Sequence, residues 1–567
     1  MKELMMALGA CVCAAFGAMP VAAGTASGQV TVDFSRVTGP IKPVNGVGQP
    51  PILGLDGTNM FHYLKNAGIP YSRLHDVGGA FGANVFVDIP NLFRDFDADE
   101  TKAESYDFFY TDLLLKALVE NGVEPYFRLG VTIENAAGRG GKAYRIFPPK
   151  DYAKWARICE HVVRHYTEGW ADGFRMKITH WEIWNEPENW DTIERNQMWK
   201  APFSAYVRLY VVTARHLKEK FPHLMIGGYG SCGFYGVGSS WGRMSDSRVS
   251  FLMRCLPEFL EGIRRENAPL DFFSFHCYDM PRFLPAQIAH ARKTLDSYGY
   301  AKTELSCNEW HPGGEPGSVR QAADIAAMLV AFQNGATADA EIYDAKCGRG
   351  EYSPLFNCLT CRPYKAYSVY LAFNELRKLG QAVAVTGSAD ACDGQGLWVV
   401  AATDGRGRQA VFVVNAEQTA QPLPEFFPGS SVRVRAIDAE RDFADMPSVG
   451  TIGGHTVLLI EGTQANEETH DSGCRGVCRA WCDGGLHSDL ERSAEGLHAG
   501  RVRRGERHAV RRPRHQRAKR SLAGVGHAVD RVAKRWRVLL GDEHRGTALL
   551  PAVVLQLRLG ARLRQLL

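Results

Sequence analysis

Two glutamates, each at the end of a short apolar segment, are the residues of this sequence best suited to catalysis. Glu186 ends the run His180-Trp-Glu-Ile-Trp-Asn and is followed by Pro187, and Glu309 ends the run Leu305-Ser-Cys-Asn. Both patterns are typical of buried strands that present polar side chains at their carboxyl ends. Two facing carboxylates suit glycoside hydrolysis, in which one protonates the leaving oxygen and the other attacks the sugar or activates water. Carboxyl groups about 5–5.5 Å apart would retain the anomeric configuration and groups about 6.5–9.5 Å apart would invert it. The sequence leaves this choice open.

The surroundings of Glu186 predict how it ionises. Three tryptophans lie close to it in sequence, namely Trp181, Trp184 and Trp190. A carboxyl group flanked by these rings would be partly withdrawn from water, which raises its pKa and lets it carry a proton near neutral pH. We therefore expect Glu186 to act as a general acid. The alternative is a simple Asn-Glu-Pro turn after a core strand, and the second carboxylate argues against it.

Alternating strands and helices between residues 51 and 380 must position these side chains. Short apolar runs alternate with amphipathic segments such as Asp107–Glu120, Pro148–His165 and Ser204–Lys220, a pattern that predicts a parallel sheet covered by helices. Eight candidate strands fit a (β/α)8 TIM barrel. They are Pro70–Leu74, Asn84–Ile89, Glu124–Leu129, Thr179–Trp184, Leu224–Gly228, Asp271–His276, Thr303–Asn308 and Asp339–Tyr343. Glu186 then closes the fourth strand and Glu309 the seventh, so both would project at the face where barrel enzymes hold their chemistry.

A second domain is predicted after the barrel. Residues 381–463 contain short strands separated by turns and no helix-length segment, with strands expected at Gly396–Ala402, Gln409–Asn415, Ser431–Ile437 and His455–Ile460. We interpret them as an accessory β-sandwich. An early strand at Val30–Phe34, within a connector spanning residues 24–50, is expected to join it. The predicted fold class is therefore α/β, a TIM barrel with an accessory β-sandwich domain.

The N-terminal 23 residues resemble a secretory signal peptide. Lys2 precedes an apolar, small-residue run that ends in Val21-Ala22-Ala23 before Gly24. We therefore expect a secreted or periplasmic protein. Leu8-Gly9-Ala10-Cys11 resembles a bacterial lipoprotein cleavage site, so a lipid anchor is a minor alternative.

Charge separates the body from the tail. Residues 471–567 hold 21 Lys+Arg against 9 Asp+Glu, which leaves residues 1–470 mildly acidic with 45 against 53. Nothing in the body indicates a nucleic-acid or membrane-surface partner. The tail, residues 464–567, is rich in Arg and its last 97 residues lack Phe, Tyr, Ile, Asn and Met. We interpret it as a frameshifted reading of GC-rich DNA; a disordered basic tail that binds an acidic surface, or nucleic acid, is the alternative.

The nine cysteines of the body are expected to be buried thiols rather than a disulfide framework, because their number is odd and they are spread through apolar segments. Cys358-Leu-Thr-Cys361, near Cys347, is the one place where a loop disulfide or a metal is an alternative.

Five segments together resemble glycoside hydrolase family 39, over about residues 29–462. They are Arg73-Leu-His75-Asp76, Pro148-Pro-Lys-Asp-Tyr-Ala-Lys-Trp155, Glu182-Ile-Trp-Asn-Glu-Pro187, Asp271-Phe-Phe-Ser-Phe-His276 and Asn308-Glu309-Trp310. The family contains β-xylosidases and α-L-iduronidases of a retaining, barrel-based clan. The resemblance implies a fold and a double-displacement reaction with no metal or organic cofactor.

The same resemblance assigns roles to residues. It makes Glu186 the acid/base, Glu309 the nucleophile and Asn185 the ligand of the sugar 2-hydroxyl. His276 and Tyr278 would orient the nucleophile or contact the sugar, with satisfied core residues as an equal alternative. Arg73 and His75, at the end of the first predicted strand, are expected near Glu309, where a cation would hold it ionised; a structural ion pair is the alternative. Trp310 beside Glu309 is a further substrate-binding candidate.

Two departures from the family pattern affect specificity. Asn308 stands before the nucleophile where xylosidases of the family carry Thr, and no Trp occurs between Trp310 and Trp398 to close strand eight. Tyr343 or Tyr352 would then supply the sugar platform. We expect an exo-acting retaining glycoside hydrolase on β-xylosides or related glycans. A transglycosylase and a catalytically inactive carbohydrate-binding protein are the alternatives, and the oligomeric state is left open.

Overall fold

The computed structural model describes residues 30–50, 60–77, 86–133, 145–240, 245–343, 355–357 and 360–463. They all belong to the first of two units into which the chain divides, Met1–Asp471. The predicted signal peptide, the Arg-rich tail, Tyr352, Cys347 and Cys358 lie outside the described residues. Among the described residues, no helix has the length and apolar composition needed to cross a membrane.

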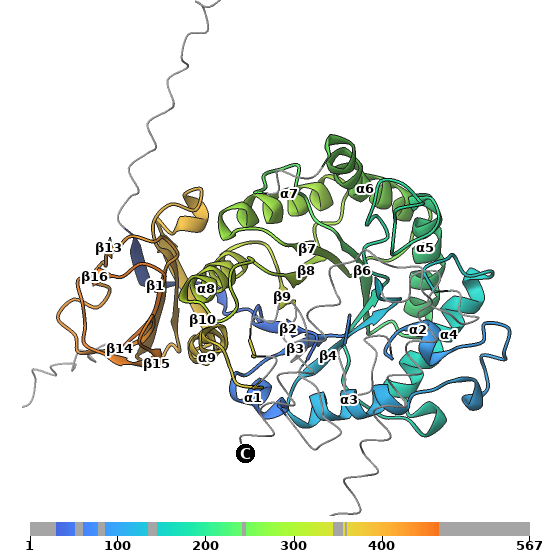
Figure 1. The fold of residues 1–567 in the computed structure, drawn as a ribbon, viewed down its shortest axis with the longest axis horizontal. Coiled ribbons are helices and arrows are strands. Elements are labelled where there is room, and N and C mark those ends of the chain that lie inside the picture. Colours follow the sequence, from blue (N-terminus) through green and yellow to red (C-terminus); the bar gives the residue numbers. More distant parts are fainter. Residues whose placement is uncertain are drawn as a thin grey trace, which may run out of the picture. The chain divides into compact units, whose positions relative to one another are not determined.

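Eight parallel strands close into a barrel, as predicted (Figure 1). They are β2 (Gly46–Gly48), β3 (Tyr71–Arg73), β4 (Glu124–Leu129), β5 (His180–Ile183), β6 (Met225–Ser231), β7 (Phe272–Cys277), β8 (Glu304–Trp310) and β9 (Asp339–Ile342). Almost every position of these strands is buried, because helices cover the outside and side chains fill the inside.

One predicted barrel strand is wrong and one was missed. Residues 86–88 form a turn and Ile89 begins a short helix, so Asn84–Ile89 does not supply a strand in its described part. The strand is instead Gly46–Gly48, inside the stretch expected to be a connector. A Cβ atom at Gly46 would lie 2.9 Å from the carbonyl oxygen of Ala340, so the close approach of β2 to β9 requires glycine there. The two errors compensate, so Glu186 still follows the fourth strand and Glu309 still lies at the carboxyl end of the seventh. Arg73 ends the second strand rather than the first.

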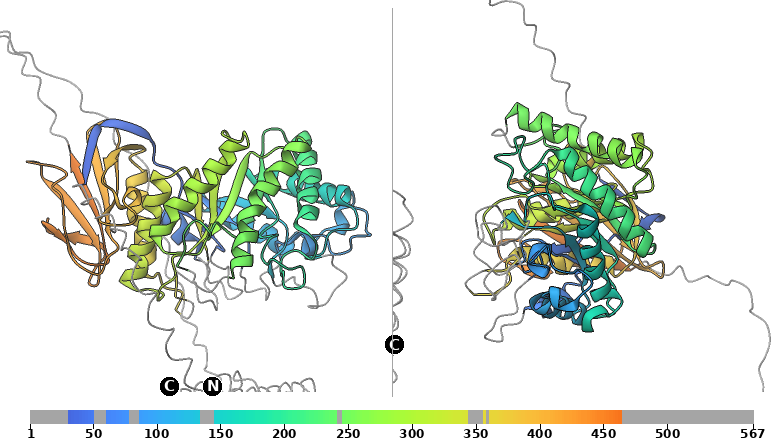
Figure 2. Two further views of the ribbon diagram at one scale, coloured as in Figure 1. Left: turned by 90° about the horizontal axis from the view of Figure 1, so that it is seen from above. Right: turned by 90° about the vertical axis from the view of Figure 1, so that its right-hand side faces the viewer.

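Helices surround the barrel (Figures 1 and 2). They are α1 (Phe61–Asn66), α2 (Ile89–Leu92), α3 (Phe109–Glu120), α4 (Tyr152–Thr167), α5 (Phe203–Lys220), α6 (Asp246–Arg265), α7 (Leu284–Ser297), α8 (Val319–Asn334) and α9 (Lys365–Arg377). Three begin at side-chain caps, because Asp151, Ser245 and Ser318 accept hydrogen bonds from backbone N–H groups of the first turn. The helices predicted near residues 107–120, 148–165 and 204–220 are present as α3, α4 and α5.

The accessory domain is built on a seven-stranded antiparallel sheet in the order β1-β10-β11-β12-β17-β14-β15, with a two-stranded sheet β13-β16. The strands are β1 (Thr31–Pro40), β10 (Gln381–Thr386), β11 (Trp398–Thr403), β12 (Arg408–Asn415), β13 (Gln421–Pro422), β14 (Val432–Ile437), β15 (Asp442–Met446), β16 (Thr451–Ile452) and β17 (Thr456–Thr463). The early strand pairs with β10, as expected. The accessory β domain is thus confirmed, with one large sheet in place of two comparable layers.

Helix α8 connects the two parts. Residues 321–333 of this helix are all buried, which is typical of a helix enclosed on every side. It contacts α7 and α9 of the barrel layer and also β11, β12 and β17 of the sheet. Barrel and sheet therefore share one continuous hydrophobic core.

Candidate active site

Arg73 is the buried centre of a polar cluster at the carboxyl ends of the barrel strands. Its guanidinium donates from Nε to Glu182 at 2.8 Å, from Nη1 to Glu309 at 2.8 Å and from Nη2 to Asn185 at 2.6 Å. Burial lowers the pKa of Arg73, but the negative charges of Glu182 and Glu309 outweigh it and raise that pKa above its usual value. Arg73 therefore stays cationic and balances the charge of Glu309 while it orients Asn185.

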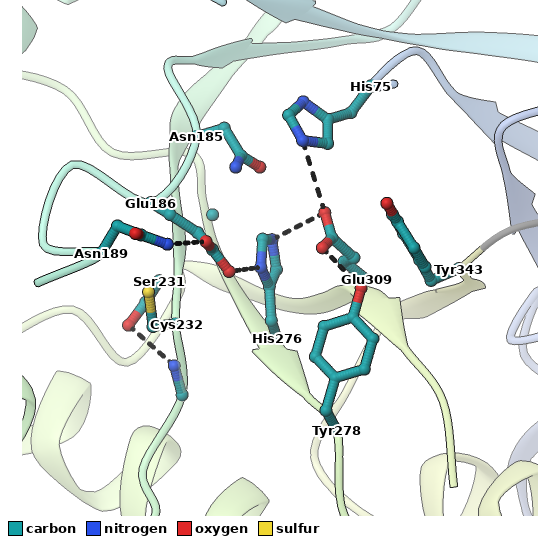
Figure 3. A network of polar contacts seen from close by, with 12 residues as sticks. His75, Asn185, Glu186, Asn189, Ser231, Cys232, His276, Tyr278, Glu309 and Tyr343 are labelled. Carbon is teal, nitrogen blue, oxygen red and sulfur yellow. Dashed lines mark hydrogen bonds and ion pairs between the residues drawn. The ribbon is translucent and has the colours of Figure 1, made fainter. Parts of the chain in front are cut away.

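Glu309 has both carboxylate oxygens occupied. Tyr278 donates its hydroxyl to Oε1 at 2.6 Å, and Arg73 donates to Oε2. His75 Nε2 lies 4.0 Å from Oε2, and His276 Nε2 lies 3.7 Å from it (Figure 3). These contacts fix the carboxylate in one orientation, as a nucleophile requires.

Glu186 faces Glu309 across His276 (Figure 3). One Glu186 oxygen contacts His276 Nδ1 at 2.8 Å, and the other accepts from the Asn189 amide at 2.7 Å. One oxygen of Glu186, one of Glu309 and a ring nitrogen of His276 all lie within 4.8 Å of one another. The two carboxylates thus approach closely enough to address one anomeric centre.

Irregular backbone at the strand ends produces this arrangement. Trp184 and Glu186 have φ of 80° and 43°, the left-handed region that costs energy for residues other than glycine. The pairing of β7 with β8 shifts register just before His276 meets Glu309, which turns the two side chains toward the site. Gly230 lies beneath them, since a Cβ there would come within 3.1 Å of both Arg73 Nη2 and His276 Nε2.

The contact between Glu186 and His276 shifts their two pKa values in opposite directions. Burial raises the pKa of Glu186, but the hydrogen bond and charge of His276, together with Asn189 and Arg73, bring it below its usual value. Burial lowers the pKa of His276, yet Glu309 and Glu186 raise it above its usual value. Both shifts favour a proton on His276 over one on Glu186.

This result contradicts the expected rise in the pKa of Glu186. Burial does raise that pKa, but His276, Asn189 and Arg73 outweigh the rise, and the three tryptophans make their contacts elsewhere. Trp181 stacks on Phe127, Trp184 donates its indole N–H to the Met198 carbonyl, and Trp190 stacks against Arg195 and Arg248. Successive side chains of a strand point to opposite faces, so Trp181 and Ile183 face outward while Glu182 faces the barrel interior.

Trp310 is also misplaced by the sequence interpretation. Its ring is fully buried and packs against Phe332 of α8, at 5.2 Å between ring centres. It lies on the helix side of β8 and does not face the carboxylates. The remaining candidates, namely Arg73, His75, Asn185, Glu186, His276, Tyr278 and Glu309, do come together.

Four residues of the cluster were missed, because their roles depend on contacts across strands. Glu182 accepts from Ser274 at 2.6 Å and from Asn308 at 2.7 Å, so Asn308 supports Glu182. Asn189 holds Glu186. Tyr343, which was not missed, donates to Asp76 at 2.8 Å and packs edge-on against Tyr278. It therefore borders the site, and its role as the sugar platform stays a prediction. The alternation of Glu182 with Trp181 and Ile183 was the available signal for an inward carboxylate.

Two groups of histidine and carboxylate side chains in the described part of the chain are spaced closely enough to hold a metal ion. Among the described residues, His180, Glu304 and Asp339 form a second histidine and carboxylate group, at the amino ends of β5, β8 and β9. In the active-site group, Arg73, Tyr278 and Asn189 already donate to the carboxylates, an arrangement suited to charge pairing. Five of the body cysteines are buried thiols, as expected, and Cys361 and Cys392 are half-buried and free.

Part of the chain is similar in sequence to known glycosidases. Residues 63–293 match the model of glycosyl hydrolases family 39. A beta-xylosidase from Geobacillus stearothermophilus is 27% identical over 229 residues, which are 40% of this chain and 39% of that protein. The match thus spans about two-fifths of that relative's length.

Solved structures are similar over a larger part of the chain. A glucosidase from Croceicoccus marinus superposes with a TM-score of 0.59 at 19% identity, covering 77% of this chain and 99% of that one. A monomeric beta-xylosidase from Caulobacter crescentus gives 0.52 at 17% identity, covering 76% and 99%. At these identities the likeness establishes the fold, a barrel with an accessory β domain.

Proposed function

We propose that this chain is a retaining glycoside hydrolase of family 39, whose model its barrel residues 63–293 match. The observation that carries the proposal is that one carboxylate oxygen of Glu186 lies within 4.8 Å of one carboxylate oxygen of Glu309. That distance supports a covalent intermediate, because inversion needs carboxyl groups about 6.5–9.5 Å apart to admit water.

In the first step Glu309 attacks the anomeric carbon while Glu186 protonates the leaving oxygen. The proton reaches Glu186 from His276, which lies 2.8 Å away. When Glu309 forms the glycosyl ester, it loses its negative charge. Arg73 then remains paired with the carboxylate of Glu182. In the second step Glu186 deprotonates a water molecule whose oxygen attacks the anomeric carbon, and the bond from that carbon to Glu309 breaks. The sugar leaves with its configuration retained, and the proton on Glu186 returns to His276.

Asn185 lies where it could bind the sugar 2-hydroxyl, because Arg73 holds its side-chain oxygen and leaves its NH₂ group to donate. We infer exo-action on β-xylosides or related glycans, supported by the beta-xylosidase among the relatives. Export through the N-terminal 23 residues is part of the same proposal.

Two substitutions test the mechanism on aryl β-xylosides. Glu309→Ala should lower kcat at least about a thousandfold on every substrate, because no other carboxylate can replace the nucleophile. Glu186→Ala should lower kcat/KM by about 10²–10⁴-fold for poor leaving groups and far less for nitrophenyl groups, which depart without a proton. Glu315→Ala, at an exposed glutamate beyond β8, is the matched control. Near-native rates in Glu309→Ala, or an inverted first product by NMR, would refute the mechanism.

A further inference from the structure

Two arginines stack on one tryptophan close to Glu186. The guanidinium carbon of Arg195 lies 3.8 Å from the centre of the Trp190 ring, and that of Arg248 lies 4.2 Å from it. Trp190 and Arg248 are half-buried and Arg195 is exposed. Within the described ranges neither guanidinium forms an ion pair with a carboxylate.

Among the described residues, the acidic side chains nearest in sequence form no ion pair with either guanidinium; they are Glu188, Asp191, Glu194 and Asp246. Asp191 accepts from the Ser247 hydroxyl at 2.8 Å, and Glu194 is exposed with its backbone carbonyl bound to Lys200. Two like charges that share an aromatic ring repel one another unless an anion compensates them. The cluster therefore offers unbalanced positive charge next to an apolar surface.

Hydrogen bonds connect the cluster to the acid. Arg248 donates from Nη2 to the Asn189 carbonyl at 2.9 Å, and the Asn189 amide donates to Glu186 at 2.7 Å. Asn189 lies on the side of Glu186 opposite Glu309 (Figure 3). The acid protonates the leaving group and the nucleophile attacks from the other side, so this is the direction in which the leaving group departs.

We propose that Arg195, Trp190 and Arg248 form a subsite for an anionic substituent, a carboxylate or a sulfate, on the leaving group of the glycoside. The guanidinium fork matches the two oxygens of either anion, and the indole ring keeps both forks in place. The subsite rests on the proposed function, because that function makes Glu186 the acid and so defines the leaving-group side. It selects a uronic acid or a sulfated sugar next to the bond that is cleaved.

Binding can be measured without turnover, by NMR titration of the full chain with methyl β-D-glucuronide, methyl β-D-glucoside and methyl β-D-glucoside 6-sulfate. The wild-type protein should bind at least one anionic sugar about tenfold more tightly than the neutral one at low salt, and the two anionic arms distinguish carboxylate from sulfate. The double variant Arg195→Gln/Arg248→Gln should reduce this preference to about onefold.

Arg264→Gln is the matched control, since Arg264 also stacks on an aromatic ring, that of Tyr298, from the same helix α6. It should keep the preference. Equal affinity for neutral and anionic sugars in the wild type, or a preference that survives in the double variant, would overturn the subsite. Hydrolysis of a neutral aryl β-xyloside reports separately on the proposed function, so the two failures are distinguishable.

Discussion

Glu188 is a buried carboxyl group two residues beyond the proposed acid, and it holds the acid's loop against β6. One of its oxygens accepts from the Ser231 hydroxyl and from the Cys232 N–H, both at 2.8 Å, while its second oxygen is buried without a hydrogen-bond partner. The Glu186 N–H donates to the Gly230 carbonyl beside it. Burial raises the pKa of Glu188 from 4.5 to about 7.

This raised pKa has a defined consequence for stability. The folded state holds a proton that the unfolded state releases above pH 4.5, so the contribution of Glu188 is fully favourable below pH 4.5 and is lost as pH rises through about 7. At about 1.4 kcal/mol per pH unit, the loss amounts to about 3 kcal/mol. Glutamine cannot ionise, so Glu188→Gln should remove this contribution to the fall in the free energy of unfolding between pH 5 and pH 8. Urea-unfolding titrations at each pH measure that fall.

The wild type and the Glu188 variant are compared by how their free energies of unfolding change with pH. Their absolute stabilities are not compared, because the amide that this substitution introduces would itself be buried without a partner. Glu425→Gln, at an exposed glutamate of the sheet domain, should leave the decline as it is in the wild type. An equally steep decline in the Glu188 variant would show that this carboxyl group does not titrate as inferred.

At the scale of elements, the contact between β6 and β7 decides where Ser231, Gly230 and His276 lie. Gly227 of β6 pairs with Phe272 of β7, and a Cβ atom at Gly227 would stand 2.1 Å from the Phe272 carbonyl oxygen. This clash would involve the backbone of the neighbouring strand, so it could be relieved only by moving β6 and β7 apart. The close approach therefore depends on the missing side chain.

Gly227→Ala should destabilise the protein by about 1–3 kcal/mol, lower its Tm and reduce activity, because the strand ends that support Glu186 would shift. Gly450→Ala is the control, since a Cβ there meets nothing within 4 Å. Differential scanning calorimetry and aryl-glycoside hydrolysis measure both effects. If the two variants had the same Tm, the tight β6–β7 contact would not be a requirement of the fold.

Continuous apolar runs made most barrel strands predictable, and the two glutamates stood out because a strand must end where its side chains become polar. Strand β2 was missed, because Gly46-Val-Gly48 has one apolar side chain and forms a strand only through its partners β3 and β9. The sequence predicted most of the residues of the site, but it did not predict the hydrogen bonds and ion pairs that connect them. Trp310 was assigned wrongly although strand alternation carried the signal, because a residue next to the inward-facing Glu309 in β8 must face α8.

At the scale of the whole molecule, the sheet domain and the barrel are expected to unfold together. Phe412 of β12 packs edge-on against Phe373 of α9, with ring centres 5.8 Å apart, and both belong to the core that includes the barrel. The opposite face of the sheet has its own cluster, in which Phe34 stacks on Phe427 at 5.2 Å.

Phe412→Ala should therefore cost about 3–5 kcal/mol and lower the unfolding temperature of the barrel as well as of the sheet. Phe34→Ala removes a ring of the same size from a half-buried position on the far face, and a smaller loss is expected. Calorimetry on each variant should give one transition whose calorimetric and van't Hoff enthalpies agree, with hydrolytic activity disappearing at the same temperature. A separate early transition in Phe412→Ala that leaves activity intact would mean that the barrel folds without its sheet, and the shared core around α8 would then not make the two parts one cooperative unit.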